Sequence, residues 1–485
     1  MKNIIYKIVI VVFISGILYS CSENLDQLPF DEFATENAFV TADDFENGIR
    51  GVYKALVSID RDGVVSTGYY GSSDAGSLLS AGDVASDNTT ISQSGRRTKN
   101  ILHNFRYSPS SGVSLANFYA DAYTLIFRAN QVLLYAENFT GDSKANIMAE
   151  AKALRAMAHF DLVRTFGKIP TQSGDANGSL GIAYVIELDP NIEPERETVS
   201  EVYQKIVSDL VEATAAINVS NPPGRMGKDA VNTLLSRVYL YMGQWQNSID
   251  AANAVTKTVA DRDDVVGVWE DNSLAGVIFY IPNSEEGLNN SIGVAWSQGG
   301  LNSIIPEYVA SFNLVNTYLA DDIRKEAYIV SGSNGGLQFN AIKKLLGKNG
   351  AFDGKVDYKI FRAAEAHLNK AEALFKLGNE SGARTALDAI RSKRYLTPPA
   401  GETGSALLNA IQLERRLEFA FEYQRFYDLK RWALPIQRSN AGDLADGSGT
   451  ASEVLSLPAG DYKFQLPISQ GTLDQNPNTA QNPGY

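Results

Sequence analysis

Residues 229–255 read DAVNTLLSRVYLYMGQWQNSIDAANAV, and this stretch decides the fold class. Apolar residues recur every three or four positions on both sides of a central glycine, the spacing that places them on one face of a helix. A glycine between two such segments is typical of the turn between paired helices, where it ends the first helix. The residues at the expected packing positions are Leu235, Tyr239, Gly243, Trp245, Ser248 and Ala252. Large side chains therefore alternate with small ones where the two helices approach closely, which predicts a helical hairpin.

The same pattern recurs along the chain. Further pairs are predicted at residues 115–138 with 144–166 and at residues 359–377 with 381–393, and single helices at 42–56, 199–217 and 407–432. A helix pair that recurs with a glycine at the turn is the signature of a helical solenoid. The packing positions of the pair at residues 229–255 fit the tetratricopeptide template. We therefore predict a mostly α fold, with a tetratricopeptide-like scaffold of helix pairs arranged as an α-α superhelix.

Long irregular segments interrupt this scaffold near residues 60–113, 258–356 and 436–461. They are rich in Gly, Ser, Asn and Asp, and short apolar runs within them predict short strands. Segments of this length inside a compact domain usually carry function. We expect one domain, residues 41–485, whose helical scaffold carries its function on these inserts.

The start of the chain has the pattern of a secretory leader. A cationic beginning precedes an apolar run at residues 8–18, which is too short to span a bilayer. Cys21, the only cysteine in 485 residues, follows directly after a small residue. This arrangement resembles a bacterial lipobox and predicts lipidation of Cys21, after removal of residues 1–20 as a signal peptide. Residues 21–40 would form an acidic tether. The alternative is an ordinary signal peptide and a buried cysteine.

Composition excludes several classes of protein. The net charge of −13 makes nucleic acid an unfavourable partner, because phosphates would be repelled. The three histidines, His103, His159 and His367, lack the spacing of a metal site. Nucleotide-binding and nucleophile-elbow motifs are absent from the sequence. We therefore expect no catalytic residues, no metal and no cofactor.

The C-terminal region carries the most specific pattern. Residues 414–432 read ERRLEFAFEYQRFYDLKRW, and the chain ends in QNPGY at 481–485. Together with EAKALRA at 150–156 and the following turn, these residues closely resemble the SusD/RagB family, over essentially the whole mature chain. The resemblance implies an outer-membrane lipoprotein that captures nutrient, usually a glycan, without cleaving it. It also implies that the protein is the lid of a SusC-like TonB-dependent transporter. Helix pairs would contact the transporter, while the inserts face outward.

Two further predictions concern the residues after Cys21 and the C-terminal motif. The acidic residues after Cys21 resemble the surface-export signal of Bacteroidota lipoproteins, although they could equally be a solvated tether. Within the C-terminal motif, Arg415, Glu418, Glu422 and Arg425 follow one another at spacings of three or four residues, which predicts an ion-pair ladder on one helix. The motif is therefore interpreted as structural, not catalytic.

A sugar site needs exposed aromatic rings with polar side chains at the rim, because a sugar presents C–H bonds on its faces and hydroxyls around its edge. Two inserts have these residues, and the predicted ligand-binding residues are Trp296, Tyr69, Tyr70, Asp87, Asn88, Arg96, Asn302 and Tyr308. Trp296 lies in a polar, glycine-rich loop, where it would be either a ligand platform or a loop anchor. The segment 83–88 would likewise be either a ligand loop or a scaffold turn.

Other functions remain open at this stage. A transporter lid of the same family could carry peptide instead of glycan. A glycosidase needs only two carboxylates at the right separation, and no single sequence excludes such a pair. A helical scaffold that binds only protein partners would leave the polar inserts unexplained.

Overall fold

The computed structural model describes residues 39–61, 64–66, 69–70, 78–111, 116–189, 191–283, 291–300 and 303–485. The predicted lipidation site Cys21 and the predicted ligand residue Asn302 lie outside these residues. The helices are α2 (Ala42–Lys54), α3 (Leu78–Val84), α4 (Asn100–His103), α5 (Ala116–Leu134), α6 (Lys144–Phe166), α7 (Val199–Ala216), α8 (Lys228–Met242), α9 (Trp245–Asn253), α10 (Val265–Trp269), α11 (Phe312–Thr317), α12 (Ile323–Tyr328), α13 (Ala363–Lys376), α14 (Glu380–Arg391), α15 (Gly404–Glu418), α16 (Arg425–Arg431) and α17 (Gln470–Gln475).

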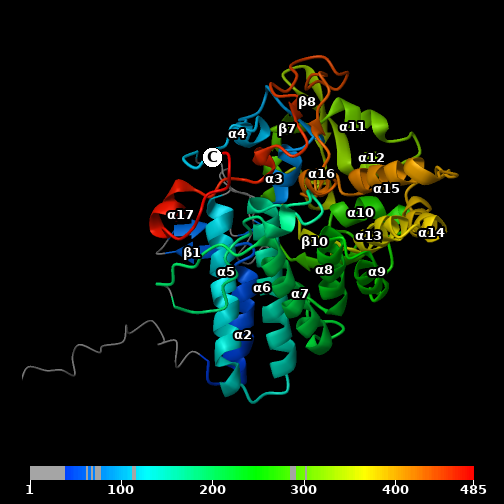
Figure 1. The fold of residues 1–485 in the computed structure, drawn as a ribbon. Helices are drawn as coiled ribbons and strands as arrows, with labels where there is room; N and C mark the ends of the chain where they lie inside the picture. Colours follow the sequence, from blue (N-terminus) through cyan, green and yellow to red (C-terminus); the bar gives the residue numbers. More distant parts are fainter. Residues whose placement is uncertain are drawn as a thin grey trace, which may run out of the picture.

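The long helices stack in chain order (Figure 1). Helix α2 packs on α5, α5 on α6, α6 on α7, α7 on α8 and α8 on α9, and α13 then packs on α9, α14 and α15. Within the described residues, no helix combines the length and apolar character needed to cross a membrane. The predicted fold class, a tetratricopeptide-like scaffold of helix pairs, is confirmed.

Local sequence explains where several helices begin and end. Thr41 and Asp44 form a reciprocal capping box at the start of α2, as the predicted N-cap requires. Gly243 has a φ of 71° and ends α8, so that α9 folds back against it. The Ser236 hydroxyl donates to the Ser248 carbonyl at 3.0 Å, which shows how closely the small residues let the two helices approach.

The predicted long helix at residues 407–432 is wrong. It is two helices, α15 and α16, separated by a loop in which Phe421 and Tyr423 have φ values of 68° and 57°. Non-glycine residues rarely adopt this left-handed conformation, and it breaks the run of helical hydrogen bonds. The i,i+4 spacing of apolar residues is therefore real within each helix but does not continue through the loop.

The predicted helix at residues 359–377 also begins later than expected. Its first residues belong to strand β10 (Tyr358–Arg362), which pairs antiparallel with β4 (Val277–Ile281). All five side chains of β10 are buried, so alternation gives no signal for a strand. Helix α13 starts at Ala363.

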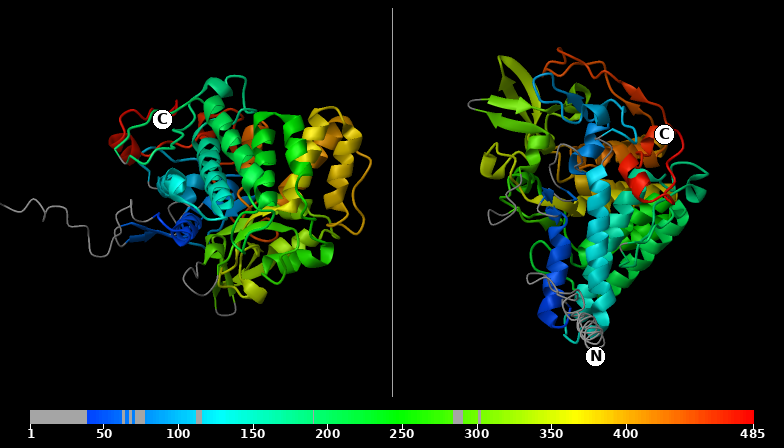
Figure 2. Two further views of the ribbon diagram at one scale, coloured as in Figure 1. Left: turned by 90° about the horizontal axis from the view of Figure 1, so that it is seen from below. Right: turned by 90° about the vertical axis from the view of Figure 1, so that its left-hand side faces the viewer.

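Most of the remaining strands lie in the long segments between helices. They are β1 (Ile59–Arg61), β2 (Val64–Ser66), β3 (Thr89–Ile91), β5 (Ser297–Gly300), β6 (Ser303–Pro306), β7 (Tyr308–Ala310), β8 (Ile329–Asn334), β9 (Leu337–Ile342), β11 (Ile436–Gln437) and β12 (Ser456–Leu457). The order β3-β7-β9-β8 forms a four-stranded sheet, which joins residues near 90 to residues near 300–340. In the right-hand view of Figure 2 this sheet and α17 lie at opposite sides of the molecule.

Candidate functional site

The predicted segment 83–88 lies underneath the C-terminal motif and not at the surface. The Asp83 carboxylate accepts hydrogen bonds from the backbone N–H groups of Phe421, at 3.0 Å, and Tyr423, at 2.8 Å. It also accepts from the Asn88 side-chain amide at 2.8 Å. These bonds satisfy backbone donors in the loop between α15 and α16, which explains how two residues keep a left-handed conformation there.

Asp87 and Asn88 fasten the first insert to the same motif. The Asp87 carboxylate receives two parallel hydrogen bonds from the Arg425 guanidinium, at 2.8 and 2.9 Å, and Arg416 Nε donates to the Asn88 side-chain oxygen at 2.8 Å. Burial by itself raises the pKa of Asp87, but the charges of Arg425 and Arg416 outweigh it and hold the pKa below its ordinary value. Both side chains are buried. The expectation that they form a ligand rim is therefore wrong, and the scaffold reading of segment 83–88 holds.

The predicted aromatic residues of the first insert are buried as well. The Tyr69 hydroxyl donates to the Asp161 carboxylate at 2.5 Å, and the Tyr70 ring meets the Tyr69 ring edge-on, with centroids 4.6 Å apart. Both residues are at most 1% exposed. They anchor the insert on α6, because Asp161 lies in that helix. The expectation of an exposed tyrosine platform is wrong.

Trp296 and Tyr308 form part of the core beneath the second insert. Trp296 is 1% exposed, and its ring contacts Tyr308 and Phe421 edge-on, at centroid distances of 6.4 and 5.9 Å. Of the two sequence readings, the loop anchor is therefore correct and the ligand platform is wrong. Arg96 differs from these residues, because its side chain is 50% exposed while it pairs with Glu307 at 3.3 Å.

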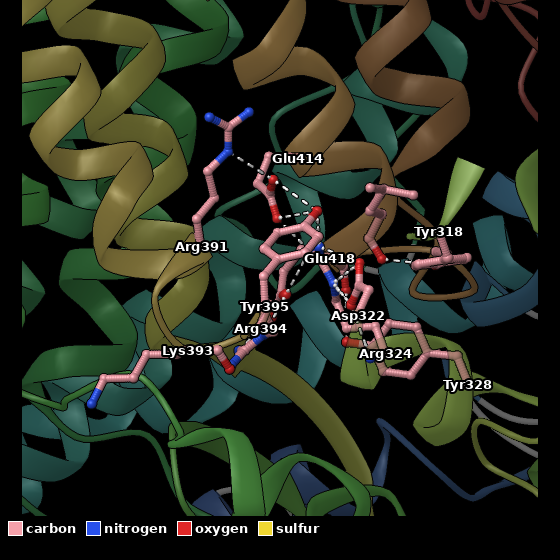
Figure 3. A network of polar contacts seen from close by, with 12 residues as sticks. Tyr318, Asp322, Arg324, Tyr328, Arg391, Lys393, Arg394, Tyr395, Glu414 and Glu418 are labelled. Carbon is pink, nitrogen blue, oxygen red and sulfur yellow. Dashed lines mark hydrogen bonds and ion pairs between the residues drawn. The ribbon is translucent and has the colours of Figure 1, made fainter. Parts of the chain in front are cut away.

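Beneath the inserts, buried charges converge on Glu418. Its carboxylate pairs with Arg394 at 2.8 Å, Arg362 at 2.7 Å and Arg324 at 3.3 Å. Figure 3 shows Glu418 beside Arg324 and Arg394. Arg324 also pairs with Glu414 at 2.6 Å. We call Glu418, its three arginine partners and Glu414 the charge seat. It joins α12, β10 and the turn after α14 to α15.

The charge seat corrects the predicted ion-pair ladder. Glu418 pairs with arginines far away in the sequence and not with Arg415, which instead binds Asp428 at 2.8 Å. Arg425 binds Asp87. Helical spacing predicted that the charged residues of the motif would pair with one another. They pair instead with residues of other elements, because a buried charge needs several hydrogen bonds at once.

This arrangement is unsuited to acid–base chemistry. Burial by itself raises the pKa of Glu418, but the charges of Arg394 and Arg362 hold it well below its ordinary value. A carboxylate locked in this way neither gives nor takes a proton near neutral pH. The motif is therefore structural, as interpreted from the sequence.

The predicted histidines are also structural where they are buried. His159 Nδ1 lies 2.9 Å from the Arg155 carbonyl and its Nε2 accepts from the Val185 N–H, while His103 contacts the Val84 carbonyl at 2.8 Å. Across the part of the chain that the structure describes, no group of three or more His, Cys, Asp or Glu residues could hold a metal ion.

Among the described residues, several surface grooves offer room for a ligand. The first, here the α5 groove, has a volume of about 240 Å³. Its lining residues are Tyr119, Tyr123, Phe127, Ala183, Val185, Glu187, Asp189, Ile192, Pro194, Thr472, Asn476 and Thr479. The second, of about 580 Å³, lies between α2, residues 222–225 and the end of β4. Its half-buried cation Arg225 is already held by Glu150, at 2.6 and 2.8 Å, and contributes no free charge.

The sequence contains a signal for the α5 groove, but helical periodicity alone does not distinguish its groove residues from its core residues. Tyr119, Tyr123 and Phe127 recur every four residues, beside a second apolar series on the same helix that faces the core. Two apolar faces on one helix exceed what packing on a scaffold requires.

The structure is a scaffold of stacked helix pairs whose inserts are held by the buried charge seat. Comparisons with known proteins find the same class of helical scaffold. Residues 57–240 match a family model described as starch-binding associating with outer membrane, and residues 346–485 match that of the SusD family. "SusD-like protein P2" of Formosa agariphila is 26% identical over 99% of both chains. "Starch-binding protein SusD" of Bacteroides thetaiotaomicron is 29% identical over 27% of this chain and 22% of its own.

Solved structures give the same result. A putative sugar binding protein from Bacteroides vulgatus superposes with a TM-score of 0.78 at 26% identity, covering 92% of this chain and 99% of that one. A SusD superfamily protein from Bacteroides thetaiotaomicron also has a TM-score of 0.78, at 25% identity over 92% and 100% of the two chains. In sequence and in fold, the chain is similar to SusD-family proteins.

Proposed function

We propose that this protein binds a glycan at the outer surface of the outer membrane without cleaving it, and acts as the lid of a SusC-like TonB-dependent transporter. The observation that carries the proposal is the likeness over nearly the whole chain to a solved structure described as a sugar binding protein. A family model for starch binding at the outer membrane supports the same ligand class and the same membrane.

The rigid attachment of the inserts fits this role. A lid has to move as one body, and largely buried ion pairs between the inserts and the helices, such as Arg324 with Glu418 and Asp87 with Arg425, resist independent movement of the two parts. We propose that residues 1–20 are a signal peptide and that lipid on Cys21, with residues 21–40 as a tether, keeps the lid at its transporter. More than one acyl chain would be needed for stable anchoring.

At the insert surface, the proposed ligand contacts are one predicted residue, Arg96, and one residue that was not predicted, Phe352. Arg96 remains as a half-exposed cation. Phe352 is 43% exposed and lies beside β5, because its carbonyl accepts from the Gly299 N–H at 2.9 Å. An exposed ring and a cation are the elements that sugar recognition uses.

The test uses the full purified chain with starch, xylan, mannan and a peptide mixture as separate probes. We expect retention on at least one polysaccharide, with no release of reducing ends, and co-purification with a TonB-dependent barrel from membranes of the native organism. Retention of peptide alone would replace the glycan by peptide cargo. Release of reducing ends by the purified protein would overturn the non-catalytic role.

A further inference from the structure

Helix α5 has an aromatic face beside its core face, and part of this aromatic face is open to solvent. Phe118, Ala122 and Leu125 are buried against the scaffold and form its core face. On the other side Phe127 is 39% exposed, and Tyr119 and Tyr123 are half-buried. These three rings form the floor of the α5 groove. Exposing them to water is unfavourable unless something covers them.

Two walls rise beside this floor. One wall is the segment around residues 183–194, whose Val185 and Glu187 carbonyls accept from the Asn130 side-chain amide at 3.1 and 3.4 Å. The other wall is α17 and the residues after it, and Figure 1 and the right-hand view of Figure 2 both show α17 beside the upper part of α5. Asn476 ties the walls together, since its side chain donates to the Pro194 carbonyl at 3.0 Å. The groove is therefore a fixed feature and not a gap between independent segments.

The rings themselves are held in place from below. The Tyr123 hydroxyl donates to the Ala183 carbonyl at 2.9 Å, and the Tyr119 ring meets Phe166 edge-on at a centroid distance of 5.1 Å. The Tyr119 and Tyr123 rings lie 4.9 Å apart. A ligand would pay little to order such a surface, because the side chains already occupy their bound positions.

The spacing of the rings suits a chain of pyranose units. Residues four apart on an α-helix are displaced by about 6 Å along its axis. This is close to the length of one sugar unit in an extended oligosaccharide. Three successive units could therefore each meet one ring of the series Tyr119, Tyr123 and Phe127. An amphipathic protein helix would match the same rings less well, because the walls present polar groups: Glu187, Asp189, Thr472 and Asn476.

Charge narrows the class of sugar. Glu187 and Asp189 are exposed at the rim, and the described residues that line the groove include no lysine or arginine. Sulfated or uronic-acid glycans would be repelled, whereas the hydroxyls of a neutral glycan can donate to the two carboxylates. From these features we infer that the α5 groove is a binding site for a neutral, extended oligosaccharide, separate from the insert face. The inference rests on the proposed function only in assuming that the protein binds carbohydrate.

The experiment measures affinity by calorimetry for hexasaccharides of known linkage. The neutral probes are β-1,4-glucan, α-1,4-glucan, β-1,4-xylan and β-1,4-mannan hexamers, and the anionic probe is hexagalacturonate. The test variant is Phe127→Ala. One control is Leu134→Ala, an exposed apolar residue outside the groove on the same helix, and the other is Phe352→Ala, an exposed ring on the insert. Phe127→Ala is expected to weaken binding of the best neutral hexamer about tenfold, which corresponds to about 1.4 kcal/mol, while Leu134→Ala leaves it unchanged.

A second variant tests the ligand class. Wild-type protein is expected to bind the neutral hexamers and not hexagalacturonate, and Glu187→Gln is expected to narrow that difference. If wild-type protein binds a hexamer but Phe127→Ala does not weaken it, and Phe352→Ala does, the groove inference is overturned while the proposed function stands. If Phe127→Ala only abolishes co-purification with the barrel, the groove is a protein interface and the inference is likewise overturned. If no hexamer binds wild-type protein at all, the proposed function and the groove inference both fail.

Discussion

The charge seat and the α5 groove combine the same kinds of side chain with opposite results. In the seat, the carboxylates are buried together with the neighbouring ring of Tyr395, over which Arg324 lies, and Glu418 is matched by three guanidinium groups. In the groove, rings lie at the surface, and Glu187 and Asp189 face solvent without a cation in the lining. Residue types alone therefore do not distinguish a binding surface from a packed joint. What distinguishes them is whether the charged groups are buried and whether cations compensate them.

The largest effect is expected from Glu418→Gln, which removes the anion that three arginines share. The remaining guanidinium charges would be buried without compensation, so the free energy of unfolding should fall by about 3 to 5 kcal/mol. Urea unfolding followed by circular dichroism measures this change. The matched control is Glu453→Gln, because the Glu453–Arg106 pair is exposed and should contribute less than about 1 kcal/mol. Equal effects of the two substitutions would contradict the difference between buried and exposed charge.

Trp296→Ala is expected to have a somewhat smaller effect, about 3 kcal/mol of destabilisation, at the lower end of the range for such truncations. The hairpin β5–β6 beside it can collapse into part of the cavity. The same unfolding experiment measures the change, with glycan affinity as a second readout. A variant that lost affinity but kept full stability would restore Trp296 as a ligand platform.

The next largest loss of stability is expected in acid, at Glu418 of the charge seat and at other buried carboxylates. The pKa values of Glu418, Asp87, Asp428 and Glu372 are all lowered, so these groups contribute stability that is present above the unfolded values of about 4 and lost as the pH falls below them. Asp83 has the opposite sign, because burial raises its pKa to about 6 and its protonation favours the folded state as the pH falls from about 6 to 4. A net loss on the order of 2 kcal/mol is expected between pH 5 and pH 3. Thermal unfolding across this range measures it, and a shallower decline in Glu418→Gln would identify the source.

The smallest change in stability is expected at the groove. Phe127→Ala should lower the free energy of unfolding by about 1 kcal/mol, because the side chain is 39% exposed and only part of its surface is packed. Urea unfolding is again the measurement. A loss of several kcal/mol would show that the ring stabilises the fold and that the groove and the seat are not different in kind.

The sequence predicted the scaffold well because its signals are local. Helix α6 has the predicted bounds, and Gly243 ends α8 as the turn pattern indicated. The break between α15 and α16 was missed because its cause lies elsewhere in the chain. No pattern within residues 407–432 shows that Asp83 binds the backbone of that loop.

The candidate site was predicted less well for a related reason. Polar, glycine-rich context around Trp296 suggested exposure, but the indole packs against Phe421 from the C-terminal motif. In contrast, the aromatic series of α5 follows helical spacing, which predicts the helix but does not show which rings face the core and which face solvent. Burial depends on which elements meet in space, and spacing within one helix does not report that.

The bonds from Asp83 to Phe421 and Tyr423 join positions 338 and 340 residues apart. A chain emerging from its amino end cannot close this contact until nearly all of it has been made or exported. Search over so long a separation is slow, and the apolar surfaces destined for it stay uncovered meanwhile. The protein therefore cannot complete folding, and needs protection from aggregation, until its C-terminal residues are present.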